Sequence, residues 1–239
     1  MKICILHIGF ASQSSESKHL PSPKRFKNLL SPFLPSTQWT TYNCVEGELP
    51  KETDIFDAYI ITGGKYSVFD SYGWQFNLFD CIRSIYQKKI PIIGVCYGHQ
   101  AITHVLGGEV KRHNIGYGAG VVELEVDNLK QPKWLNPKLN KVNVFSMHQD
   151  QITKLPKGAI NFLSSQFCNF SGFYIENKVL GIQQHPEFTS ELCRDLILKR
   201  KEKIGEKYKI ALKSLNKETH GSILGQWMAK FLNQTISMP

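Results

Sequence analysis

The segment PIIGVCYGHQ, residues 91–100, contains the motif on which the fold prediction rests. An apolar run ends at Cys96, with Gly94 and Gly98 two residues to either side, where a helix is expected to begin. The form G-x-C-x-G is the thiol counterpart of G-x-S-x-G, in which a nucleophile occupies a sharp strand-to-helix turn. The glycines allow that turn, and the free N–H groups of the next helix favour negative charge on the sulfur. Cys96 is therefore the predicted nucleophile, although a buried structural cysteine would explain this motif taken alone.

A second stretch, GIQQHPEF at residues 181–188, offers a base for that thiol. His185 and Glu187 are two residues apart, so their side chains project to the same side of an extended segment. Pro186 favours that extended conformation for the residue before it. The carboxylate can hold one ring nitrogen of the imidazole while the other faces a nucleophile. A surface histidine beside a charged turn is the alternative for this motif alone.

Donors for an oxyanion are expected from two places. Gly63 and Gly64 end the predicted strand DAYIITGG, and the loop after a parallel strand emerges at the same sheet edge as the nucleophile. The backbone N–H of Tyr97, at the start of the following helix, is the second expected donor. An ordinary tight turn is the alternative for the glycine pair.

The order of predicted elements indicates an α/β fold. The first half alternates strands and helices, which predicts a mostly parallel central sheet with helices on both faces. Strands are expected at 2–9, 37–45, 57–64 and 90–96, and helices at 24–31, 74–89 and 98–106. The second half has short strands between turn residues, which predict added antiparallel hairpins at 118–126, 142–148, 160–166, 171–177 and 179–185. No linker is evident, so we expect one domain over 1–239, closed by C-terminal helices at about 190–235.

The pattern of charged residues and the length of the apolar runs argue against a nucleic-acid-binding, membrane-spanning or secreted protein. The 239 residues carry a net charge of +9, and many lysines gather in Lys199–Lys217, where apolar residues recur at helical spacing. An amphipathic helix with a basic, solvated face explains that segment, and no RNA-binding motif accompanies it, so we expect no nucleic-acid partner. No apolar run reaches the ~20 residues of a membrane span, and the N-terminus lacks a signal-peptide pattern, which favours the cytoplasm.

The six cysteines are scattered without a CxxC pair. Reduced thiols are therefore a better interpretation than a disulfide framework. We expect no metal site, since no second half of a zinc site accompanies the Cys-x-x-His of CYGH, and no cofactor.

Together these motifs resemble the class-I glutamine amidotransferases. The resemblance rests on ITGG at 61–64, GVCYGHQ at 94–100 and HPE at 185–187, and is greatest to stand-alone proteins similar to the amidotransferase domain of GMP synthase. It implies a flavodoxin-like architecture and a Cys96–His185–Glu187 triad. It also implies that Gln100 and the backbone around Met147, His148 and Gln149 contact a glutamine-like substrate.

The activity implied by the resemblance is hydrolysis of the glutamine side chain through a γ-glutamyl thioester. A γ-glutamyl peptidase acting on glutathione-like compounds would use the same triad, and the sequence leaves this alternative open. A catalytically idle binding or regulatory module is an alternative of another class. The chain has no phosphate loop, so any ammonia-accepting synthase would be a separate chain. The core motifs do not explain the polar loop Ala11–Lys24 or the basic segment Lys199–Lys217.

Overall fold

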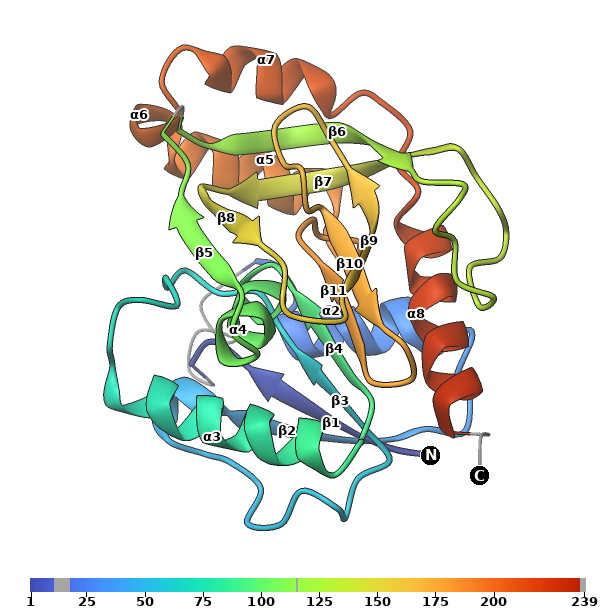
Figure 1. The fold of residues 1–239 in the computed structure, drawn as a ribbon. Helices are drawn as coiled ribbons and strands as arrows, with labels where there is room; N and C mark the ends of the chain where they lie inside the picture. The colour runs from blue at the N-terminus through green and yellow to red at the C-terminus, as the bar shows by residue number, and fades with distance from the viewer. Residues whose placement is uncertain (11–17, 115, 237–239) are drawn as a thin grey trace.

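A computed structural model describes residues 1–10, 18–114 and 116–236. Its main sheet has the strand order β2-β1-β3-β4-β11-β10-β9-β6-β7 (Figure 1). The first five of these run parallel, in an order matching the 2-1-3-4-5 arrangement of flavodoxin-like folds. They are β1 (Lys2–His7), β2 (Gln38–Asn43), β3 (Ala58–Ile61), β4 (Ile92–Val95) and β11 (Val179–Ile182). The predicted fold class is confirmed.

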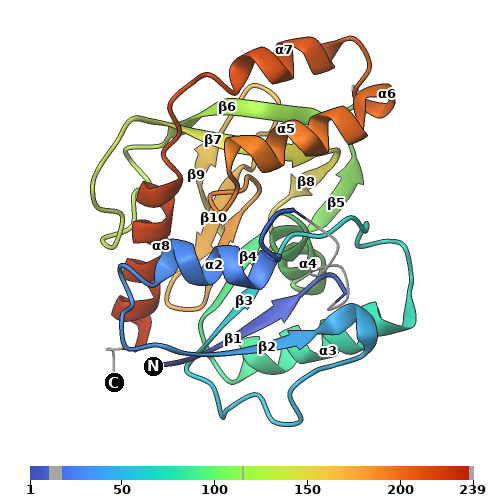
Figure 2. The same cartoon turned by 180° about the vertical axis from the view of Figure 1, so that it is seen from behind.

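Both faces of the parallel strands are buried, as their nearly continuous apolar sequences require. In β1, Ile3 and Ile5 pack on one side with α2 (Ser22–Leu30) and α8 (Gly221–Ile236). Cys4 and Leu6 pack on the other side with α3 (Gly73–Gln87) and α4 (Tyr97–Val105). Figure 1 shows α3 and α4 in front of these strands, and the reverse view in Figure 2 shows α2 in front.

The later strands extend the same sheet in antiparallel fashion, as predicted. These strands are β6 (Gly118–Val126), β7 (Lys141–His148), β9 (Ile160–Ser164) and β10 (Gly172–Ile175). A separate ribbon pairs β5 (Glu109–Arg112) with β8 (Asp150–Lys154), and neither strand was expected from the sequence. A 3-10 turn, η1, spans Cys44–Glu46.

The basic segment Lys199–Lys217 is not one helix, and that prediction was wrong. The chain forms α5 (Ser190–Lys199), α6 (Lys201–Ile204) and α7 (Lys207–Ser214) instead. The break lies at Gly205, whose φ of 66° and ψ of −160° do not continue a helix. The predicted apolar positions Ile204, Ala211 and Leu215 are nevertheless buried, and they cover β6 and β7 (Figure 2).

The predicted loop Ala11–Lys24 also needs a correction at its end. Residues 11–17 lie outside the described residues. The chain is already helical at Ser22, because Pro23 stands in the first turn of α2, where a fixed φ favours a helix and no N–H is needed.

The topology brings three loops to one edge of the sheet. Strand β4 lies between β3 and β11, with Gly94 opposite Ile61 and Val95 opposite Ile182. All three strands are parallel, so their carboxyl ends meet. The loops that follow them carry the predicted oxyanion donors, nucleophile and base.

Candidate active site

Cys96 occupies a strained turn between β4 and α4. Its φ is 53° and its ψ −104°, an unusual conformation for a residue with a side chain. A Cβ at Gly94 would lie 2.4 Å from the carbonyl oxygen of Gly98, and a Cβ at Gly98 would lie 2.4 Å from that of Ile61. Both glycines of the motif are therefore required by close backbone packing, and the turn holds Cys96 at the N-terminus of α4.

His185 and Glu187 lie just beyond β11 and are joined by a hydrogen bond of 2.8 Å between Nδ1 and Oε1. The backbone N–H of His185 donates to the carbonyl of Phe145, which ties this loop to β7. Burial alone would lower the pKa of His185, but the interactions with Glu187 and Cys96 outweigh it and raise the pKa to about 10. The site therefore favours the protonated form of the imidazole at neutral pH.

Gly63 is the point where these groups meet. A Cβ there would lie 2.7 Å from Cε1 of His185 and 3.3 Å from Cβ of Cys96. Gly64 packs equally closely on Ile8, at 2.4 Å from Cγ2 for an added Cβ. Among the described residues, no hydrogen bond uses the backbone N–H of Gly64 or Tyr97. As far as the described residues go, both donors are therefore open to a ligand in the cavity of Cys96.

The residues predicted to contact substrate line one cavity with Cys96. The cavity has a volume of about 450 Å³, and Tyr97 lines it together with Gln100, Met147, His148 and Gln149. The Gln100 amide donates to the Asp150 carbonyl at 2.6 Å and to the Gln183 side chain at 3.0 Å, so it is already held by the protein. The structure thus brings these residues to the cysteine, with the Gln100 amide nitrogen engaged inward.

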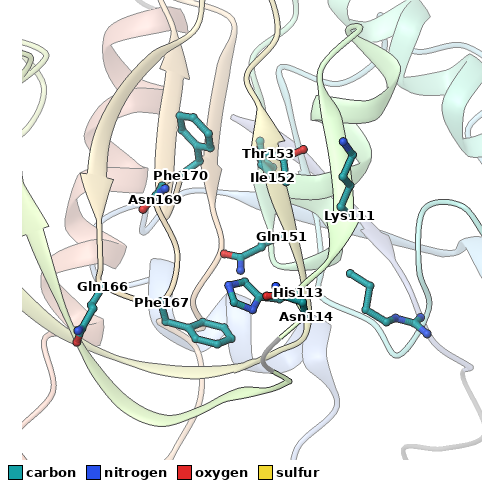
Figure 3. Close-up of a pocket in the computed structure, with 11 residues that line it drawn as sticks. Lys111, His113, Asn114, Gln151, Ile152, Thr153, Gln166, Phe167, Asn169 and Phe170 are labelled. Atoms are coloured by element: carbon teal, nitrogen blue, oxygen red, sulfur yellow. The ribbon is translucent and has the colours of Figure 1, made fainter.

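His148 is neutral, and its ring contacts the backbone of Asp150 and the side chain of Phe167. Burial lowers its pKa to about 3, and its Nδ1 lies 3.2 Å from the Asp150 carbonyl. Its ring meets Phe167 edge-on at 5.5 Å, and Phe167 stacks on His113 at 4.5 Å. Figure 3 shows Phe167 and His113 side by side in a neighbouring cleft of about 520 Å³. Phe167 therefore packs between His113 and His148, and of these three only His148 lines the cavity that contains Cys96.

Asp150 links three segments around the cavity and was missed as a site residue. Its carboxylate accepts from Nε of Arg112 at 3.2 Å and from the hydroxyl of Ser67. Arg112 also donates to Ser67 at 3.2 Å. The partners lie 38 and 83 residues away, so the β5–β8 ribbon, and no local motif, creates this network.

Phe188 is a second residue that sequence reasoning did not single out, although it directly follows the HPE motif. Its ring stacks on His185 with centroids 3.9 Å apart and planes 14° apart. The guanidinium of Arg25 lies over the Phe188 ring at 5.5 Å. The imidazole is therefore held by a carboxylate at its edge and an aromatic ring on its face.

All six cysteines are unpaired and buried. In the described part of the chain, three or more metal-ligating side chains nowhere gather as a cation would require. A search of the described helices for an apolar stretch able to cross a bilayer finds none.

Comparison with known families gives one match. The family described as "Glutamine amidotransferase class-I" matches residues 37–203, which contain all the predicted site residues. Gamma-glutamyl peptidase 3 of Arabidopsis thaliana is 28% identical over 166 residues, covering 67% of each chain. One chain of the glutamine-hydrolysing GMP synthase of Methanosarcina acetivorans, named as a subunit of that enzyme, is 33% identical over 121 residues, which are 50% of this chain and 61% of the relative.

The fold also has solved counterparts. A crystal structure of a glutamine amidotransferase from Thermotoga maritima superposes with a TM-score of 0.76, covering 99% of both chains at 20% identity. At that identity the match concerns the fold, and it extends to the segments before residue 37 and after residue 203.

Proposed function

The chain belongs to the class-I glutamine amidotransferase family, and we propose that it hydrolyses the side-chain amide of glutamine with Cys96 as nucleophile. The observation that carries this proposal is the meeting of three loops at Gly63, within van der Waals reach of both Cys96 and His185. A strained cysteine, a paired imidazole and free backbone donors in one place are the parts that acyl transfer needs.

In the proposed reaction the proton of the Cys96 thiol passes to His185, whose protonated form the site favours, and the sulfur attacks the γ-carbonyl carbon. The tetrahedral intermediate collapses as the C–N bond breaks, and His185 gives the proton to the departing nitrogen. Ammonia leaves and a γ-glutamyl thioester remains on Cys96. Water then attacks the thioester with His185 as base, releasing glutamate and restoring the thiol. Glu187 keeps the proton of His185 on Nδ1 and stabilises the imidazolium.

The oxyanion of each tetrahedral intermediate would be bound by the N–H groups of Gly64 and Tyr97, with Gly63 setting the loop. Such donors each typically lower the barrier by roughly 3–4 kcal/mol. Gln100, Met147, His148 and Gln149 would hold the α-amino and α-carboxylate groups of the substrate. Their place in the cavity of Cys96 supports this assignment.

A γ-glutamyl peptidase is the second candidate. The similarity to gamma-glutamyl peptidase 3 favours it, and the same residues would act, with an amine of an amino acid or peptide leaving in place of ammonia. An idle site is the third candidate, and it predicts that Cys96 reacts with alkylating agents no faster than an ordinary buried thiol.

Product analysis with glutamine and glutathione tests the candidates, with the Cys96→Ala variant beside the wild type. Ammonia and glutamate from glutamine, absent with the variant, support the amidotransferase activity. Cysteinylglycine from glutathione, with little glutamine turnover, supports the peptidase. Turnover of neither substrate by the wild type, together with slow alkylation of Cys96, contradicts both.

We further propose that residues 1–239 act as one domain in the cytoplasm without a cofactor. Six buried, unpaired thiols suit a reducing compartment. If ammonia is delivered to an acceptor, that synthase would be another chain, as the name of the Methanosarcina relative suggests for that protein.

A further inference from the structure

Two cavities meet at the candidate catalytic groups. Cys96 lines one of about 450 Å³, and His185 lines another of about 630 Å³. They share a wall that includes Gly64, Met147 and Arg200. In acyl transfer the nucleophile keeps the acyl half, while the imidazole protonates the departing nitrogen. The γ-glutamyl half therefore belongs in the first cavity, and the leaving group faces the second.

The second cavity is far larger than ammonia requires, and it is strongly cationic. Arg25, Lys65, Lys199 and Arg200 line it, and among its described lining residues only Glu187 carries a carboxylate, which already pairs with His185 at 2.8 Å. Asp150 carries the one carboxylate among the described residues that line the first cavity, and it is likewise paired, with Arg112 at 3.2 Å.

The positive charges of Lys65, Lys199 and Arg200 are not balanced by a neighbouring carboxylate of the described residues. Within the described ranges, no carboxylate lies within 4.0 Å of the charged groups of Lys65, Lys199 or Arg200. Lys203, on the side of Cys96, is unpaired in the same way. An excess of positive charge at the mouth of a pocket raises the local concentration of anionic ligands.

Arg200 has a buried hydrogen-bond donor that a bound ligand could pair with. It lines both cavities and follows the last residue of α5. Its Nη1 is buried and has no hydrogen-bond partner in the described part of the chain. Buried donors are almost always paired in proteins, and a guanidinium pairs best with a carboxylate. The orphaned nitrogen marks a position where an anionic group of the ligand would sit.

We propose that the cavity of His185 is a subsite for a leaving group that carries a carboxylate, bound by Arg200 with Lys65 beside it. This inference rests on the proposed Cys96 chemistry and deepens the second candidate function, for which the substrate would be a γ-glutamyl amino acid or peptide with a free carboxylate. The γ-carbonyl C–N bond breaks and the leaving nitrogen takes the proton of His185. The carboxylate takes no part in the bond changes and positions the leaving group.

The test compares γ-glutamyl-alanine with γ-glutamyl-alaninamide, which differ only in the leaving-group carboxylate. For the wild type we expect kcat/KM for the acid to exceed that for the amide about tenfold at low ionic strength, with the ratio falling as salt is added. In Arg200→Gln the ratio should fall to within about threefold of one, because the paired charge is gone. Lys201→Gln, an exposed neighbour with the same charge change, should keep the wild-type ratio.

Where both compounds are hydrolysed, two outcomes overturn the subsite while leaving the proposed reaction intact. One is equal hydrolysis of acid and amide by the wild type. The other is an equal loss in Arg200→Gln for glutamine, acid and amide, which would place Arg200 on the γ-glutamyl half.

If the wild type hydrolyses glutamine but neither of these compounds, the subsite is overturned and the proposed reaction stands. If it hydrolyses neither these compounds nor glutamine, the proposed reaction fails, and binding still decides the subsite. Calorimetry with the Cys96→Ala variant should show tighter binding of the acid than of the amide, and adding Arg200→Gln should remove the difference. Equal binding of both compounds would overturn the subsite.

Discussion

The imidazole of His185 and the carboxylate of Glu187 form a hydrogen bond of 2.8 Å in a setting where both side chains are almost wholly buried. The second carboxylate oxygen of Glu187 has no hydrogen-bond partner among the described residues. The negative charge of this carboxylate is thus directed at one ring, and two further contacts of that ring, with Cys96 and Phe188, complete its surroundings.

The first prediction concerns pH and stability. The pKa of His185 is about 10 in the folded protein against an ordinary 6.5, so above pH 6.5 the folded state binds a proton that the unfolded chain releases. This stabilisation is complete below about pH 6.5 and is lost as the pH rises through 10. In Glu187→Gln the pKa of His185 falls, so the difference in urea midpoint between wild type and variant should shrink from pH 6 to pH 10.

Comparing the two proteins cancels the other groups that titrate in this range. A difference in midpoint that stays constant over the whole range would show that Glu187 does not hold the proton on His185. The same variant should lose about 10⁴-fold in kcat, the loss that the equivalent change causes in serine hydrolases.

The second prediction concerns Gly63. In Gly63→Ala the new methyl group would press on His185 and Cys96, which lie 2.7 and 3.3 Å away. Displacement of reacting groups by about 1 Å can cost about 10²-fold in rate, so we expect a loss of that order in kcat. Gly73→Ala is the matched control, since its Cβ meets nothing within 4 Å, and it should keep full activity. Unchanged kcat in Gly63→Ala would mean that the three loops are not held together at this point.

The third prediction concerns the Asp150 network. Asp150→Asn weakens the pair with Arg112 and the bond to Ser67 near the cavity of Cys96, and hydrogen bonds to charged groups are typically worth about 1.5–3 kcal/mol. We expect a loss of about 2 kcal/mol in the free energy of unfolding, measured with urea. Asp127→Asn weakens an exposed pair with Lys130 and should change the free energy of unfolding far less, because water and salt screen exposed pairs. Equal effects of the two substitutions would contradict a structural role for Asp150.

Much of the candidate site was predictable from the sequence, because its residues closely follow strongly apolar strands. Cys96, His185 and Gly63 each follow a short buried strand, and parallel pairing alone places the three loops at one edge. The Asp150–Arg112 pair was not predictable, because β5 is largely exposed and lacks the alternation that marks a strand. Its register with β8 comes from tertiary pairing, which no local pattern records.

The basic segment Lys199–Lys217 likewise has a feature that local sequence patterns could not predict, namely the break between its helices. Its apolar spacing correctly indicated which residues are buried, such as Ile204 and Ala211. Spacing cannot reveal that the chain turns at Gly205, because residues on both sides of the turn cover the same strands. The position of Arg200 between two cavities depends on where α5 ends, and so it too emerged only from the structure.

The last prediction concerns Phe188, a positioning residue that acts through His185. Its ring lies flat against the imidazole at 3.9 Å, and such aromatic pairs are worth about 0.5–1.5 kcal/mol beyond their area. Phe188→Leu should therefore lower kcat about two- to tenfold, leave KM nearly unchanged and shift the pH profile of kcat, because the ring that titrates has lost its support. Phe188→Tyr keeps the stacked ring and should restore both kcat and the profile. Phe76→Leu, at a side chain 55% exposed on α3, is the control for an aromatic loss elsewhere. A purely structural role would lower the urea midpoint of Phe188→Leu and leave its pH profile in place, and that result would remove Phe188 from the mechanism.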